Sequence, residues 1–118
     1  MRKILLSSIL IVFLISSCAS LKPHPRAWTA EEKGCAAFFI LAHLADVYTT
    51  EKMLDNGHVE MNPILGKHPS DTELAIYFPL TATIGLVLSH FFPKLRKPLL
   101  YGYGTLSFGA AIHNQSLY

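Results

Sequence analysis

The sequence predicts an all-α protein, a small helical membrane protein with about three transmembrane or membrane-embedded helices after a cleaved signal. Its 118 residues are 51% hydrophobic and only 15% charged, whereas soluble domains average about 25% charged residues. A chain of this size has too little interior to bury so much apolar surface in water. Spanning strands would require more segments, each of about ten alternating residues, than this length allows, so the expected elements are helices.

The first 17 residues have the pattern of a bacterial lipoprotein signal peptide. Arg2 and Lys3 precede an apolar run over residues 4–15, which is long enough for a signal sequence but shorter than the roughly 20 residues of a spanning helix. The run leads into Leu-Ile-Ser-Ser-Cys, which resembles the lipobox whose cysteine, here Cys18, is lipidated when the signal is cleaved. The alternative is an uncleaved helix in which Cys18 is incidental.

We predict that residues 18–33 form a tether between this anchor and the helices. Two prolines oppose a helix at its centre and favour an extended chain. Trp28 is either an interfacial anchor, because indole prefers the headgroup level, or an ordinary linker residue. Thr29, followed within three residues by two glutamates, has the pattern of a helix N-terminus.

Residues 34–118 are expected to form the helical membrane domain. The first helix is predicted at residues 34–54, because the Asn-Gly pair at positions 56 and 57 is typical of a turn. An irregular connection then folds back toward the bilayer surface. The second helix, residues 74–92, is the clearest span, since it is nearly all apolar over the length that a bilayer requires. Ser70 or Thr72 could cap it.

Proline and glycine mark the rest of this domain. We expect Pro79 in the first turns of the second helix, where its missing N–H is tolerated. A basic turn follows, and the third helix is predicted at residues 99–112. Gly102, Gly104 and Gly109 would let this helix approach a neighbour closely. That neighbour could be another helix of the chain, another membrane protein or a second copy.

The expected topology contains a conflict. Lipidation of Cys18 starts the mature chain on the periplasmic side of the inner membrane, and three spans then place the basic turn at residues 93–98 outside. The positive-inside rule favours the reverse orientation, because this turn carries three basic residues and the first connection is acidic on balance. Either the lipobox is unused or one segment does not span fully.

A polar cluster interrupts the end of the first helix and the connection after it. On a helix, His43, Asp46 and Thr50 share one face. A carboxylate in hydrocarbon needs a partner, and His43 is the nearest candidate for Asp46. We also expect Asp46 and Thr50 to meet the connection where the chain re-enters, with the proline after the asparagine holding that asparagine in an extended or turn conformation. The complete predicted cluster is His43, Asp46, Thr49, Thr50, Glu60, Asn62 and Pro63.

The alternative to a structural cluster is an intramembrane metal-binding or hydrolytic site. His43, Asp46, His90 and His113 supply nitrogen and oxygen ligands, although they lack the spacing of known metal motifs. No serine or threonine has the sequence context of a nucleophile. We therefore favour packing over catalysis and expect no cofactor.

The cluster also carries a resemblance to a family. Asp46-x-x-Thr-Thr, followed by Glu60-x-Asn-Pro and two more apolar segments, resembles an uncharacterised group of small bacterial integral membrane proteins. The resemblance covers residues 41–118, implies a helical membrane domain, and brings no activity with it. The lipobox departs from the pattern of that group and puts the topology in doubt.

These observations predict a lipid-anchored, multi-pass protein of the bacterial envelope that acts as a non-enzymatic accessory or interaction subunit. The residue after Cys18, Ala19, is not the aspartate that retains lipoproteins in the inner membrane, which would indicate the outer membrane. Apolar helices favour the inner membrane instead. Small size and the lipobox also fit an envelope protein of a bacteriophage or mobile element. The formal charge of +2 is too small and too scattered for a nucleic-acid-binding protein.

Overall fold

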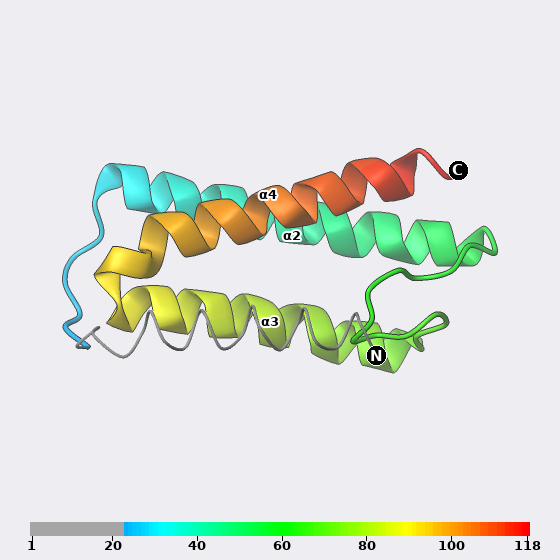
Figure 1. Ribbon diagram of the computed structural model, residues 1–118, viewed down its shortest axis with the longest axis horizontal. Helices are drawn as coiled ribbons and strands as arrows, with labels where there is room; N and C mark the ends of the chain where they lie inside the picture. The colour runs from blue at the N-terminus through cyan, green and yellow to red at the C-terminus, as the bar shows by residue number, and fades with distance from the viewer. Residues whose placement is uncertain (1–22) are drawn as a thin grey trace, which may run out of the picture.

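The computed structural model describes residues 23–118 (Figure 1). The predicted signal peptide and the predicted lipidation site, Cys18, lie outside these residues. Within them the chain is all-helical and contains three α-helices: α2 (Ala30–Asp55), α3 (Asp71–Phe91) and α4 (Arg96–Gln115). A short 3₁₀ turn, η1 (Pro93–Leu95), joins α3 to α4.

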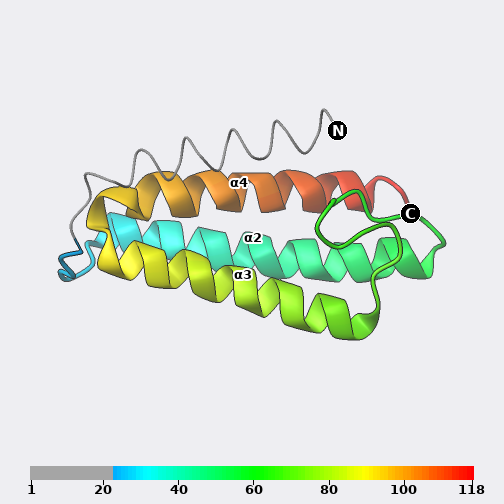
Figure 2. The same ribbon diagram turned by 60° about the horizontal axis from the view of Figure 1, so that its bottom comes forward.

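The three helices lie side by side along the long axis of the molecule. In the rotated view α2 lies between α4 and α3 (Figure 2). Helices α2 and α4 run in the same direction and pack together most extensively, whereas α3 runs antiparallel to both and makes fewer contacts with each. One end of the bundle therefore holds the start of α2 and the α3–α4 turn, and the opposite end holds the connection between α2 and α3.

Local sequence explains where the helices begin and end. Thr29 and Ser70 each accept a hydrogen bond from the backbone N–H three residues later, and the glutamate at that position bonds back to the capping residue. These capping boxes satisfy donors that have no partner inside the helix. Asn56 caps the end of α2, and Gly57 follows with a φ of +83° that favours glycine. The predicted cap at Thr29 and the predicted turn after α2 are confirmed, and the cap of α3 is Ser70 rather than Thr72.

Each helix is longer than predicted. α2 begins four residues before position 34, so part of the predicted tether is helical, and α4 begins at Arg96, inside the predicted basic turn. Pro98 is no obstacle, because its missing N–H falls in the first turn of α4. Pro79 differs from the prediction. It is the ninth residue of α3 and lies in the helix interior, where it removes the usual donor to the carbonyl of Ala75.

Two glycines allow the helices to approach closely. A Cβ atom on Gly104 of α4 would lie 2.8 Å from the Phe38 ring and 3.2 Å from the backbone Cα of Phe39 in α2. A Cβ on Gly85 of α3 would lie 3.0 Å from the ring of Phe39, which is buried at the centre of the bundle. Gly104 thus has the role predicted for the glycines of the third helix, close approach to a neighbouring helix, and that neighbour is α2 of the same chain. The other two predicted glycines on α4 have open space around them.

Among the described residues, α3 is the one helix that is long and apolar enough to cross a membrane. Its mean hydropathy over the best window is 1.6, and only 17% of that window is buried inside the protein. Length and composition alone define this candidate. The core helix of a soluble protein, which passes the same test, would be mostly buried.

Candidate functional site

A cavity of about 220 Å³, lined by both polar and apolar side chains, lies at the connection end of the bundle. Side chains from all three helices and from the connection line it: Asp46, Thr50, Glu60, Met61, Asn62, Leu65, Phe78, Ala110, His113 and Asn114. The connection folds back over this end of the bundle (Figure 1). It thereby brings the second half of the predicted cluster to the first half, as we expected from the sequence.

Asn114 of α4 joins the two threonines of the cluster. Its side-chain N–H₂ lies 3.0 Å from Thr50 Oγ1 and 3.4 Å from Thr49 Oγ1, and all three residues are buried. Thr49 donates to the backbone carbonyl of Ala45 at 2.9 Å, and Thr50 Oγ1 lies 3.4 Å from a carboxylate oxygen of Asp46. These bonds form a network that holds α4 against α2.

The connection half of the cluster is a compact turn. Glu60 accepts a hydrogen bond from the backbone N–H of Asn62 at 2.8 Å, and the side-chain oxygen of Asn62 accepts one from the N–H of Ile64 at 3.0 Å. The amide nitrogen of Asn62 donates to the Tyr77 hydroxyl of α3 at 2.8 Å. Pro63 stands between these bonded groups, where its fixed φ favours the turn. The motif therefore shapes the connection and ties it to α3.

His43 does not pair with Asp46. It lies at the centre of the bundle, where Nε2 is 3.0 Å from the carbonyl oxygen of Phe78 and 3.0 Å from Thr81 Oγ1 of α3. Nδ1 is 3.3 Å from Ser107 Oγ of α4. A carbonyl oxygen only accepts, so Nε2 carries the hydrogen, and Nδ1 of the neutral ring accepts from the Ser107 hydroxyl. Both nitrogens link α2 to its neighbours, and neither is available to a metal or a substrate.

The four residues of the alternative metal site are not brought together. His90 lies exposed at the α3–α4 end of the bundle, whereas His113 lines the cavity at the connection end, about 26 Å away by the rise of α4. Asp46 and His113 share the cavity, but His43 faces the helix core. Among residues 23–118 no three histidine, cysteine or acidic side chains gather as they would around a metal ion.

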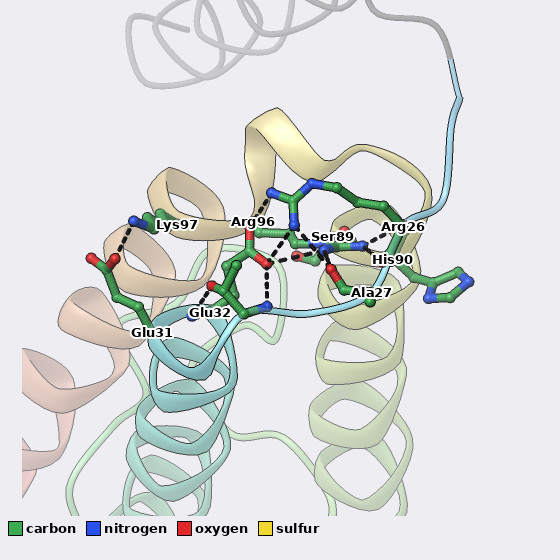
Figure 3. Close-up of polar contacts among 9 residues, drawn as sticks. Arg26, Ala27, Glu31, Glu32, Ser89, His90, Arg96 and Lys97 are labelled. Atoms are coloured by element: carbon green, nitrogen blue, oxygen red, sulfur yellow. Dashed lines mark hydrogen bonds and ion pairs between the residues drawn. The ribbon is translucent and has the colours of Figure 1, made fainter.

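The most heavily bonded side chain lies at the other end of the bundle. Arg96 is fully buried at the start of α4. Its guanidinium donates to the carbonyls of Ser89 at 2.8 Å and His90 at 3.2 Å, which belong to the end of α3. It also donates to the carbonyls of Arg26 at 2.7 Å and Ala27 at 3.2 Å, and to the Glu32 carboxylate at 3.1 Å (Figure 3). One arginine thus joins the segment before α2 to all three helices.

The carboxylate of Glu32 is the acidic centre of this site. It accepts from Arg26 at 2.6 Å, from the backbone N–H of Thr29 at 2.9 Å and from Arg96. These bonds, that of Arg26 first, lower the pKa of Glu32 from its ordinary value of 4.5 to about 2. The Trp28 ring lies 4.4 Å from the Arg96 guanidinium carbon and covers it by a cation–π contact.

Sequence reasoning missed this site because it grouped Arg96 with the lysines beside it. Lys97, its neighbour, is half exposed and pairs with exposed Glu31, as a surface ion pair does. The signal in the sequence that could have revealed the buried site was arginine rather than lysine at position 96. A planar group with five donors suits a buried position among several carbonyls.

Comparison with protein-family models, with curated proteins and with solved structures finds no match. Over residues 23–118, fold and site together define a three-helix bundle with a buried polar network at each end and a histidine linking the helices at its centre.

Proposed function

We propose that this protein is a small, lipid-anchored, multi-pass protein of the bacterial inner membrane, which acts as a non-enzymatic accessory or interaction subunit. The observation that carries the membrane proposal is the distribution of its charged residues along the bundle. Apart from Asp46, every charged side chain of residues 23–118 falls at one end or the other. Between them lie three uncharged stretches: residues 34–50 (with Asp46 as the exception), 74–93 and 98–118.

The surface between the two charged ends is apolar on all three helices. The exposed large apolar side chains are Ile40, Leu41, Leu44 and Tyr48 of α2, Ile76, Leu80, Ile84, Val87, Leu88 and Phe91 of α3, and Tyr101, Leu106, Phe108 and Ile112 of α4. A soluble monomer rarely exposes an apolar surface that continues around several helices. Such a surface is stable when lipid tails or a partner protein cover it.

The non-enzymatic part of the proposal rests on how the buried polar groups are used. His43, Thr50, Asn114 and Arg96 each bond to groups of neighbouring elements. In a bilayer such bonds replace the hydrogen bonds that water cannot supply. We therefore assign the predicted cluster to helix packing, and the apolar outer face to lipids and to a membrane partner.

The ends of the bundle differ in charge. The end with the α3–α4 turn has five basic and two acidic side chains, and the connection end has two basic and five acidic ones. Residues 23–29 lie at the basic end. A lipid on Cys18 would therefore hold the basic end at the periplasmic face, against the positive-inside rule. In this orientation the C-terminus is cytoplasmic, and a reporter fused after Tyr118 that is active only in the cytoplasm would be active.

Labelling of bacterial cells with radioactive palmitate tests the anchor. We expect label on the wild-type protein and on Cys35→Ala, the matched control, and none on Cys18→Ala. Unlabelled wild-type protein would refute the lipid anchor. It would leave residues 4–15 as an uncleaved segment and remove the conflict with the positive-inside rule.

A second candidate function is metal binding or hydrolysis, the alternative that the sequence raises through His43, Asp46, His90 and His113. Asp46, Glu60 and His113 line one cavity, although among residues 23–118 no three such side chains gather as they would around a metal ion. Elemental analysis of the purified protein and of His113→Ala tests it. A stoichiometric metal that is lost with His113 would support this function over the structural one. A metal-free wild type would remove its main support.

A further inference from the structure

An apolar groove lies between α2 and α4 at the basic end of the bundle. Its walls are Gly34 and Phe38 of α2 and Pro98, Tyr101 and Gly102 of α4, and its volume is about 760 Å³. This lies within the range of about 300–1,000 Å³ that is usual for small-molecule sites. Neither of its glycines has an atom within 4 Å of the place where a Cβ would stand. None of residues 23–118 therefore fills the groove at these two glycines.

The groove has a polar rim and an apolar interior. The ion pair between Glu31 and Lys97 stands at the rim, at the charged end of the bundle. From Glu31 to Phe38 the groove follows α2 inward for seven residues, about 10 Å along the helix axis. A ligand with a polar head at the membrane surface and an apolar chain along the helices matches this arrangement.

The segment before α2 is held at the same end of the bundle. The backbone N–H of His24 donates to the carbonyl of Phe91 at 3.1 Å. Arg96, the neighbour of the rim residue Lys97, holds the carbonyls of Arg26 and Ala27. His24, the second described residue, is thus held beside the end of α3, at the same end of the bundle as the groove. Cys18 precedes the first described residue, Pro23, by five residues, a reach of at most about 18 Å in an extended chain.

We propose that this groove receives an acyl chain of the lipid carried by Cys18. The inference rests on the proposed lipid anchor and goes one step beyond it. In this proposal the glyceryl group lies near the Glu31–Lys97 rim, at the end of the bundle where residues 23–29 are held. The acyl chain then enters the groove and covers Phe38, Tyr101 and the two glycines. The anchor becomes part of the packed bundle instead of a free attachment.

Intramolecular photo-cross-linking tests this proposal. Full-length protein is produced in bacteria that are fed palmitate bearing a diazirine. It is purified in detergent, irradiated and digested, and mass spectrometry detects the Cys18 peptide joined through its acyl chain to the peptide of residues 34–52. Equal amounts of light- and heavy-nitrogen protein are mixed before irradiation. Cross-links within one copy then contain one isotope only.

Two glycine variants make the test specific to the groove. Gly102→Leu fills the groove and should lower the yield of the cross-link to residues 34–52 about tenfold, the factor that corresponds to about two buried methylene groups. Gly109→Leu is the matched control. It lies on the same helix in equally open space but outside the groove, and it should leave the yield unchanged.

Three results would overturn the proposal. Residues 34–52 joined only to free phospholipids would show that bilayer lipid occupies the groove, and mixed-isotope cross-links would indicate a second copy. An equal yield for the two leucine variants would show that the acyl chain lies elsewhere. The intact mass of the same samples separates this failure from that of the anchor, because a lipidated chain leaves the proposed anchor standing and an unlipidated chain does not.

Discussion

The contact between α2 and α4 can be tested by the same small substitution at three glycines. Gly104→Ala places a Cβ atom 2.8 Å from the Phe38 ring and 3.2 Å from the Phe39 Cα atom. The ring can turn, but the backbone atom moves only if the two helices separate. Overpacking of this kind costs about 1–3 kcal/mol. Gly102→Ala and Gly109→Ala meet nothing within 4 Å and should stabilise α4 by about 0.5–1 kcal/mol, since alanine favours a helix.

The three variants should therefore differ in sign, which separates a packing effect from helix propensity. Thermal unfolding followed by circular dichroism in a mild detergent measures it. A change of about 1 kcal/mol shifts the midpoint by about 4–8 °C in a domain of this size. We expect Gly104→Ala to unfold at a lower temperature than the wild type and the other two variants at a higher one. If Gly104→Ala were as stable as Gly109→Ala, the close contact between α2 and α4 would be refuted.

Three further predictions use the same assay. Replacing Arg96 with methionine should lower the unfolding midpoint strongly, because five hydrogen bonds at the buried end of the bundle are lost. Lys97→Met, at the exposed position beside it, is the control. An equal effect of the two substitutions would contradict this prediction. The pKa of Glu32 is lowered to about 2 in the folded protein, so its contribution to stability should be present in full above about pH 4.5 and decline as the pH falls toward 2. Glu32→Gln should lack this part of the acid dependence, and a variant with the acid profile of the wild type would exclude the proposed role. Asn114→Ala should cost about 1–3 kcal/mol, because it leaves buried hydroxyl groups without their donor, and exposed Gln115→Ala should cost little. Similar losses of stability for these two variants would contradict a stabilising role for this hydrogen-bond network.

Features that depend on nearby residues were predictable from the sequence. The cap at Thr29 and the turn at Asn56 follow from side chains that bond within three or four positions. The meeting of Asp46 with Glu60 and Asn62 was also predictable, because costly polar groups on both sides of one membrane boundary favour contact with each other. Five of the six helix ends were placed too far inward, and the end of α3 was placed one residue too far along. Apolar patterning marks the band between the charges, whereas capping residues mark where a helix starts.

Features that depend on distant partners were not predictable. Helix periodicity correctly places His43 and Asp46 on related faces of α2, yet it does not say which neighbour each side chain meets. His43 bonds residues 35 and 64 positions away, and Arg96 bonds carbonyls up to 70 positions away. Only the packing of α2 against α3 and α4 decides those pairs. A buried arginine beside lysines looks like surface charge until the fold is known.

We propose that the three-helix bundle is itself embedded in the membrane, with or without its lipid. The direct test replaces residues 1–18 with a signal peptide that is cleaved without lipidation, so that neither the lipid nor the apolar N-terminal run remains. Membranes are then extracted with alkaline carbonate, which releases peripheral proteins. We predict that the lipid-free chain stays in the membrane pellet as the wild type does. Its release into the supernatant would contradict the account, because the exposed apolar band would then have no place in the bilayer.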